Sequence, residues 1–143
     1  MKKMIIVVLV AIMLGGGIAY YLFNNVILKS DDIIKEKVVN AFQVGAFTNY
    51  DNALRVAQRD NGLVVFDEDI YRVYVAILYD DEAILKLSAY YESIGLEYYL
   101  KPIYVSEEFV NEIKDNEELL KVSSSDTYVT INSDVLSKFE EML

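Results

Sequence analysis

The hydrophobic pattern divides the chain into one uninterrupted apolar run and a body with strand and helix periodicities. The run extends from Met4 to Phe23 without any Asp, Glu, Lys or Arg, and the next charged residue is Lys29. At about 1.5 Å per residue, twenty helical residues span about 30 Å, the hydrocarbon thickness of a bilayer. The pattern therefore predicts a transmembrane helix over residues 4–28, preceded by a short tail of residues 1–3.

The body follows a mixed-charge linker, residues 29–37, and its pattern predicts a strand–helix–strand unit that occurs twice. One helix is expected to begin after Asn49 and end at Asn61-Gly62, and the other to begin after Asp80 and end at Gly95. The strands are expected over residues 41–47, 63–66, 70–78 and 96–105. This order predicts an α+β domain over residues 38–105: a βαββαβ four-stranded antiparallel sheet with both helices on one face, the ferredoxin or RNP-like arrangement.

Residues 106–143 form a C-terminal extension that the pattern predicts to be helical. An amphipathic helix is expected over residues 107–122, followed by a loop at 123–126 and a final helix capped by Ser133 or Asp134. Three roles are open for this extension. It can pack on the domain, contact another membrane protein, or cover the free face of the sheet.

Strand alternation predicts which side chains occupy the sheet face that the first two helices leave free. In the first strand, Phe42, Val44 and Ala46 are expected to be buried and Gln43 to point outward, because successive strand residues face opposite sides. The same alternation places three further side chains on the outward face: Arg72, Tyr74 and Tyr99.

Amide, guanidinium and aromatic groups together suit a neutral sugar polymer, because rings stack on sugar faces and amides bond to hydroxyls. Gln43, Arg72, Tyr74 and Tyr99 are therefore candidate glycan-binding residues. The alternative is that they stabilise the sheet as cross-strand pairs, which need no ligand.

Charge places the body relative to the membrane and excludes one class of partner. The net charge is −10, and Lys2, Lys3 and Lys29 are the only charged residues among the first thirty. Basic flanks stay in the cytoplasm, so we expect a single-pass cell-membrane protein with a cytoplasmic N-terminus and an extracytoplasmic acidic body. A cleaved signal peptide is the competing interpretation of the same run. An acidic body is poorly suited to nucleic acid, because phosphate contacts need Lys and Arg.

The residue types offer little for catalysis or metal binding. The chain contains no His and no Cys, which excludes a Ser-His-Asp triad, a thiol nucleophile and a His- or Cys-based metal site. The acidic clusters at residues 67–69 and 80–82 are typical of turns and helix caps. We therefore expect no enzyme activity, no cofactor and no metal.

The motifs and their order resemble the SPOR domain over roughly residues 38–105. The segments that carry the resemblance are Phe42-Gln43-Val44-Gly45-Ala46-Phe47, Asn52-Ala53, Tyr71-Arg72-Val73-Tyr74-Val75, Asp81-Glu82-Ala83 and Gly95-Leu96. The resemblance implies a duplicated βαββαβ fold that binds peptidoglycan glycan strands at division or sporulation septa. It also implies a groove on the free sheet face, to which Gln43 and the outward aromatic Tyr99 would contribute.

Two functions from different classes follow. The first is a membrane-anchored module that recognises peptidoglycan glycan strands. The second is a SPOR-like fold that serves as a protein–protein interaction module within a division or sporulation membrane complex, with residues 106–143 as the contact. Under the second function, the expected partners are other membrane proteins of that complex.

Overall fold

The computed structural model describes residues 36–143. The predicted tail, residues 1–3, and the predicted transmembrane helix, residues 4–28, lie outside this range, as does most of the predicted linker. Among the described residues, no helix is both long and apolar enough to cross a bilayer. The elements in chain order are β1 (Glu36–Phe47), α2 (Tyr50–Asp60), β2 (Leu63–Asp67), β3 (Ile70–Leu78), α3 (Asp81–Ser93), β4 (Tyr99–Ser106), α4 (Glu107–Val122), the 3₁₀ helix η3 (Ser125–Thr127) and α5 (Tyr128–Glu140).

The four strands form one sheet in the order β2-β3-β1-β4, and every neighbouring pair is antiparallel. This confirms the predicted α+β class and the four-stranded antiparallel sheet. The hairpin between β2 and β3 turns on Glu68 and Asp69, which both have positive φ, as a two-residue hairpin loop requires. The helices begin at the expected caps, because the Asn49 and Asp80 side chains accept backbone N–H bonds from the first turns of α2 and α3.

Three element boundaries differ from the sequence prediction. β1 begins at Glu36 rather than residue 41, because residues 36–40 pair with the last residues of β4 instead of forming a linker. β4 begins at Tyr99 rather than residue 96. The last helix begins at Tyr128, well before the predicted caps Ser133 and Asp134, because its first turn already contributes Tyr128 and Ile131 to the core.

Successive residues of the strands pack against different helices, which shows that both sheet faces are covered. Phe42 lies in a cluster with the core residues of α3 and with a few residues of α4 and α5, whereas its neighbour Ala41 lies in a different cluster, whose helical residues come from α4 and α5 alone. Likewise Val73 packs against α2, whereas Tyr74 packs against α5. Because neighbouring strand residues point to opposite faces, α2 and α3 cover one face and the C-terminal helices cover part of the other. We call the latter the α5 face.

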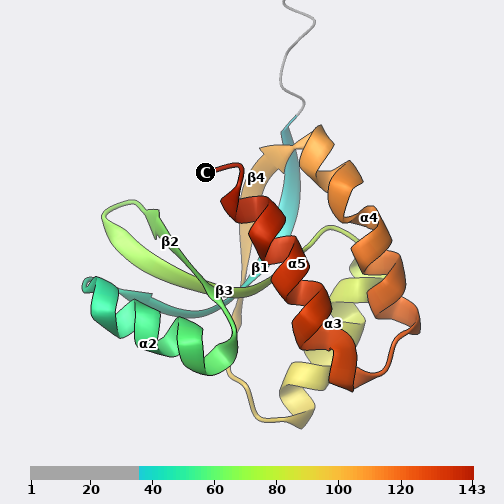
Figure 1. The fold of residues 1–143 in the computed structure, drawn as a ribbon, viewed down its shortest axis with the longest axis horizontal. Helices are drawn as coiled ribbons and strands as arrows, with labels where there is room; N and C mark the ends of the chain where they lie inside the picture. The colour runs from blue at the N-terminus through green and yellow to red at the C-terminus, as the bar shows by residue number, and fades with distance from the viewer. Residues whose placement is uncertain (1–35) are drawn as a thin grey trace, which may run out of the picture. The chain divides into compact units, whose positions relative to one another are not determined.

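The sheet is bent, and irregular pairing marks the place. β1 and β3 curve around α5, which crosses in front of them in Figure 1. The β1–β3 register shifts between Phe42 and Gln43 and again between Gln43 and Gly45, as at β-bulges. The shifts also change the alternation beyond them. Ala46, expected to be buried, is therefore exposed and lies opposite Arg72.

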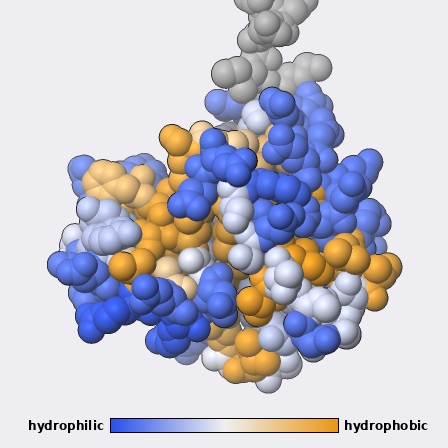
Figure 2. Space-filling view, in the orientation of Figure 1, coloured by the Kyte–Doolittle hydropathy of each residue, from blue (hydrophilic) through white to orange (hydrophobic). Residues whose placement is uncertain are grey.

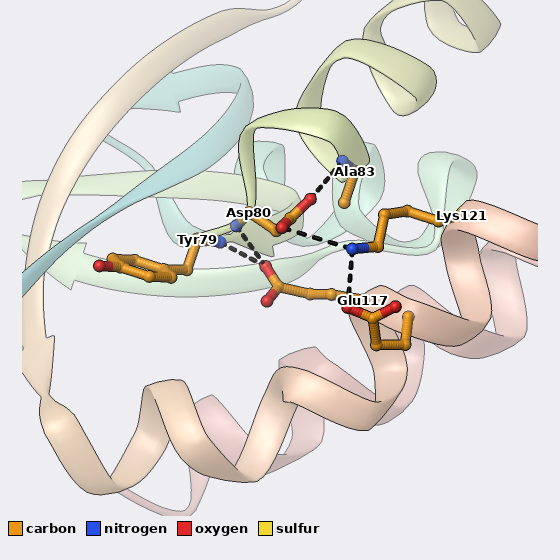
Figure 3. Close-up of polar contacts among 6 residues, drawn as sticks. Tyr79, Asp80, Ala83, Glu117 and Lys121 are labelled. Atoms are coloured by element: carbon orange, nitrogen blue, oxygen red, sulfur yellow. Dashed lines mark hydrogen bonds and ion pairs between the residues drawn. The ribbon is translucent and has the colours of Figure 1, made fainter.

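A buried carboxylate joins α4 to the junction between β3 and α3 (Figure 3). Glu117 is only 3% exposed, and its Oε1 accepts the backbone N–H groups of Tyr79 at 2.5 Å and Asp80 at 2.8 Å. Lys121, one turn later, lies 3.4 Å from Asp80 Oδ2 and 2.7 Å from Glu118 Oε1. Burial raises the pKa of Glu117, although the two backbone donors act in the opposite direction.

We expect Glu117→Ala to lower the free energy of unfolding by about 1–3 kcal/mol, because two N–H groups at the junction lose their acceptor. Chemical denaturation of the full chain measures this change. A loss below about 0.5 kcal/mol, the range of ordinary surface substitutions, would show that Glu117 does not hold α4 in place.

Glu117→Gln isolates the effect of ionisation, because the amide oxygen still accepts a backbone bond. A raised pKa means that Glu117 contributes stability below its unfolded pKa and loses that contribution as the pH rises through the folded value. The stability of the native protein relative to Glu117→Gln should therefore fall as the pH increases from about 4.5 towards 7. The lowered pKa of Asp80 has the opposite sign and is common to both proteins, so their difference removes most of it. A constant difference across this range would contradict the burial assignment.

Candidate functional site

The strand register brings the four predicted glycan-binding residues onto the α5 face. Gln43 of β1 pairs with Tyr74 of β3 on one side and with Tyr99 of β4 on the other. The Arg72 guanidinium reaches this row, because its Nη1 donates to Gln43 Oε1 at 3.2 Å. All four residues therefore lie on one face of the sheet.

Their exposure does not match a groove floor, and the prediction for Tyr74 is wrong in this respect. Tyr74 is only 2% exposed because it packs with Val135, Leu136 and Phe139 of α5. Burial raises its pKa to about 12. Tyr99, in contrast, is 63% exposed, beyond the part of the face that the C-terminal helices cover.

Arg72 is occupied by interactions within the protein. Its side chain is 13% exposed, and its Nε donates to Asp67 Oδ2 at 2.8 Å. Its Nη2 lies 3.4 Å from Glu68 Oε2, and Lys101 of β4 approaches the same Asp67 oxygen at 3.2 Å. Partial burial acts to raise the pKa of Asp67, but the hydrogen bonds from Lys101 and Arg72 outweigh it and lower the pKa. We call Asp67, Glu68, Arg72 and Lys101 the ion cluster.

The ion cluster lies beside a cleft of about 410 Å³, which we call the edge cleft because it lies between the free edges of β2 and β4. Phe66 and Tyr104, two large exposed aromatic residues, line it from these two strands at 62% and 73% exposure. Figure 2 shows a hydrophobic strip on this side, from the C-terminal end of α5 over β2 and β3. The lining residues are Val65, Phe66, Asp67, Glu68, Tyr74, Lys101, Pro102, Ile103, Tyr104, Phe139 and Leu143.

Only Tyr74 of the four candidates lines the edge cleft, so sequence reasoning missed most of this site. Phe66 carried a local signal, since it is a large apolar residue directly before the acidic turn at 67–69. Tyr104 follows Pro102 in the last strand, and Pro is typical of edge strands. The meeting of β2 and β4 depends on the bend of the sheet, which short-range patterns do not describe.

The described residues contain no group of three or more Asp and Glu side chains arranged to hold a metal ion. The carboxylates at the edge cleft are already engaged with Arg72 and Lys101. Such a site can bind through aromatic surfaces and paired polar groups.

Comparisons of the chain with models of protein families, with curated proteins and with solved structures find no match.

We expect Arg72→Met to lower the free energy of unfolding by about 1–3 kcal/mol, because charge-assisted hydrogen bonds to partly buried groups are lost. The matched control is Arg55→Met, since among residues 36–143 the Arg55 side chain bonds only to the exposed Asn52 side chain. This control should change stability by less than about 0.5 kcal/mol. Equal effects of the two substitutions in chemical denaturation would show that the ion cluster has no structural role.

Proposed function

We propose that this protein is a membrane-tethered binding module, without catalytic activity, that holds a glycan strand in the edge cleft through its sugar rings and hydroxyl groups. The observation that carries this proposal is the cleft itself, with exposed Phe66 and Tyr104 on its two strands and the ion cluster beside it. Aromatic faces suit the C–H faces of sugar rings, and charged side chains that already pair can still bond to hydroxyls.

The pairing of charges in the ion cluster favours contacts with the uncharged hydroxyl and amide groups of a ligand. Asp67 is shared by Arg72 at 2.8 Å and Lys101 at 3.2 Å, so a charged ligand would have to displace one of these contacts. Breaking a hydrogen-bonded ion pair leaves the other group without its partner, which is costly in a partly buried site. A hydroxyl-rich strand can add hydrogen bonds without separating the charges.

The proposed ligand is the glycan of the cell wall. The predicted anchor at residues 4–28 would hold the domain on the outer side of the membrane, next to newly made wall. The strand order β2-β3-β1-β4, with α2 and α3 on one face, supports the ferredoxin-like arrangement that the SPOR resemblance implies. The proposal differs from that resemblance in the position of the ligand. Part of the free sheet face is covered here, so the glycan strand is expected to bind between the sheet edges β2 and β4 instead.

A protein–protein interaction module is the second candidate, and the covered α5 face favours it. The C-terminal helices bury Tyr74 and thereby remove the centre of the predicted glycan groove. They also present exposed apolar side chains to solvent, including Leu119 at 51% and Val122 at 82% exposure near the end of α4. Apolar residues of this kind contribute to protein interfaces.

We expect the full chain in detergent to cosediment with amidase-treated peptidoglycan, and Tyr104→Ala to weaken this binding about five- to tenfold. The estimate corresponds to the loss of about 1–1.5 kcal/mol of aromatic contact. Tyr50→Ala is the matched control, since Tyr50 is 48% exposed but does not line the edge cleft. The same assay with Gln43→Ala and Tyr99→Ala tests the groove that the sequence predicts on the free sheet face.

The outcomes separate the candidates. Weaker binding by Tyr104→Ala alone supports the edge cleft. Weaker binding by Gln43→Ala and Tyr99→Ala would instead place the glycan on the α5 face, beside these two residues. Absence of cosedimentation, together with capture of a membrane protein that Leu119→Ser and Val122→Ser abolish, would replace the glycan with a protein partner.

A further inference from the structure

The end of α2 carries the single Asn-Gly pair of the sequence, Asn61-Gly62. Asn61 is exposed and caps the C-terminus of α2 in the left-handed conformation, with φ 56° and ψ 42°. Asn tolerates this conformation better than most residues other than Gly, because its short polar side chain can hydrogen-bond locally. The turn that ends α2 therefore favours Asn at this position.

Gly62 is required by the close approach of β3. A Cβ atom at this position would lie 2.8 Å from the Tyr74 carbonyl oxygen and 3.0 Å from Val73 Cγ1. The backbone of a paired strand cannot move aside as the end of a flexible side chain can, so a side chain here would displace β3. The fold therefore places Gly directly after Asn, and Gly offers the least hindered backbone nitrogen for attack on an Asn side chain.

This pair can undergo a covalent rearrangement that needs only water as co-reactant. The Gly62 nitrogen loses its proton and attacks Asn61 Cγ. The bond from Cγ to Nδ2 then breaks, and the departing NH2 group takes up a proton and leaves as ammonia. A water molecule opens the resulting cyclic succinimide at one of its two carbonyl carbons, which gives aspartate or isoaspartate at position 61.

The folded protein holds the attacking nitrogen in a hydrogen bond. Gly62 N–H donates to the Ala57 carbonyl at 2.8 Å, and the same carbonyl accepts the Asn61 N–H. The Gly62 nitrogen has to be free of this bond before it can lose its proton and turn towards Asn61 Cγ. The rearrangement therefore requires the end of α2 to open, and such local openings need less free energy than global unfolding.

The packing of α2 allows this opening to be local. The buried side chains of α2 are those of Ala53 and Ala57, whereas α4 buries Phe109, Ile113 and Leu120. Because alanine side chains bury little apolar area, α2 gains less from its contact with the sheet than α4 does. We therefore expect α2 to open while the remaining helices stay packed.

We propose that Asn61 is a deamidation site whose reaction rate is determined by local opening of α2. The product places a carboxylate next to Asp60 at a helix C-terminus, where the partial charge is already negative. The isoaspartate form also adds a carbon to the backbone directly before Gly62, which has no free space towards Tyr74. Deamidation is therefore expected to weaken α2 and the start of β2. The site does not depend on the glycan function.

Incubation of the full chain in detergent at mildly alkaline pH, followed by peptide mass spectrometry, measures the reaction at Asn61. We expect the folded protein to react at least about tenfold more slowly than the chain unfolded in guanidinium chloride, because the open state is a minor population. Asn132, which precedes Ser133 and is buried in α5, should react more slowly than Asn61 in the folded protein. Equal rates at Asn61 in the folded and unfolded chains, or no reaction at Asn61 in either, would overturn the proposal.

Asn49→Ala tests whether the opening belongs to α2, since Asn49 Oδ1 accepts the Asn52 N–H at 3.2 Å at the start of this helix. Loss of this cap should increase the open population and the deamidation rate about fivefold. Ser106→Ala is the matched control, because Ser106 Oγ accepts the Phe109 N–H at the same 3.2 Å but caps α4. This control should change the rate less than about twofold.

Hydrogen exchange of the Gly62 amide provides a second measurement of the same opening. Its exchange rate in Asn49→Ala should rise by the same factor as the deamidation rate, because both reactions need the bond to Ala57 to open. Equal acceleration of deamidation by Asn49→Ala and Ser106→Ala, or an unchanged rate in Asn49→Ala, would contradict local control by α2. The comparison of the folded and unfolded parent protein needs neither variant.

Discussion

The packing of α5 against the bent sheet is the interaction on which the remaining features depend. Val135, Leu136 and Phe139 meet Tyr74, Ile77 and Ala41 in one buried cluster, to which Phe109 and Ile113 of α4 also belong. Burial of several large apolar side chains, each contributing roughly 1.5–3 kcal/mol, makes this contact a major part of the domain's stability. Without it, a bent sheet would expose its inner face to water.

This packing also determines which surfaces can bind a ligand. It removes Tyr74 from solvent, and the end of α5 supplies Phe139 and Leu143 to the edge cleft. Asn132, earlier on the same helix, lines a second cavity together with residues of α2, α3 and β3. The buried Glu117 holds α4, which packs beside α5, against the start of α3 (Figure 3). One C-terminal segment therefore shapes both the edge cleft and this second cavity.

Local patterns in the sequence predicted the elements and the sheet well. The caps Asn49 and Asp80 depend on neighbouring residues, so they could be predicted from the sequence directly. The early start of β1 could not, because residues 36–40 form a strand only through pairing with β4. The same limit applies to the candidate site. Alternation placed Gln43, Arg72, Tyr74 and Tyr99 on one face, but the covering of Tyr74 depends on residues about sixty positions later in the chain.

The central claim is that the C-terminal helices close the α5 face, and tyrosine nitration of the full chain tests it most directly. Mild treatment with tetranitromethane followed by peptide mass spectrometry compares the reactivity of individual tyrosines. Because Tyr74 is 2% exposed and burial raises its pKa to about 12, it should remain unmodified while Tyr99 and Tyr104, at 63% and 73% exposure, react. Nitration of Tyr74 at the rate of Tyr99 in the folded protein would contradict the claim. It would show that the α5 face is open to solvent and can bind a ligand.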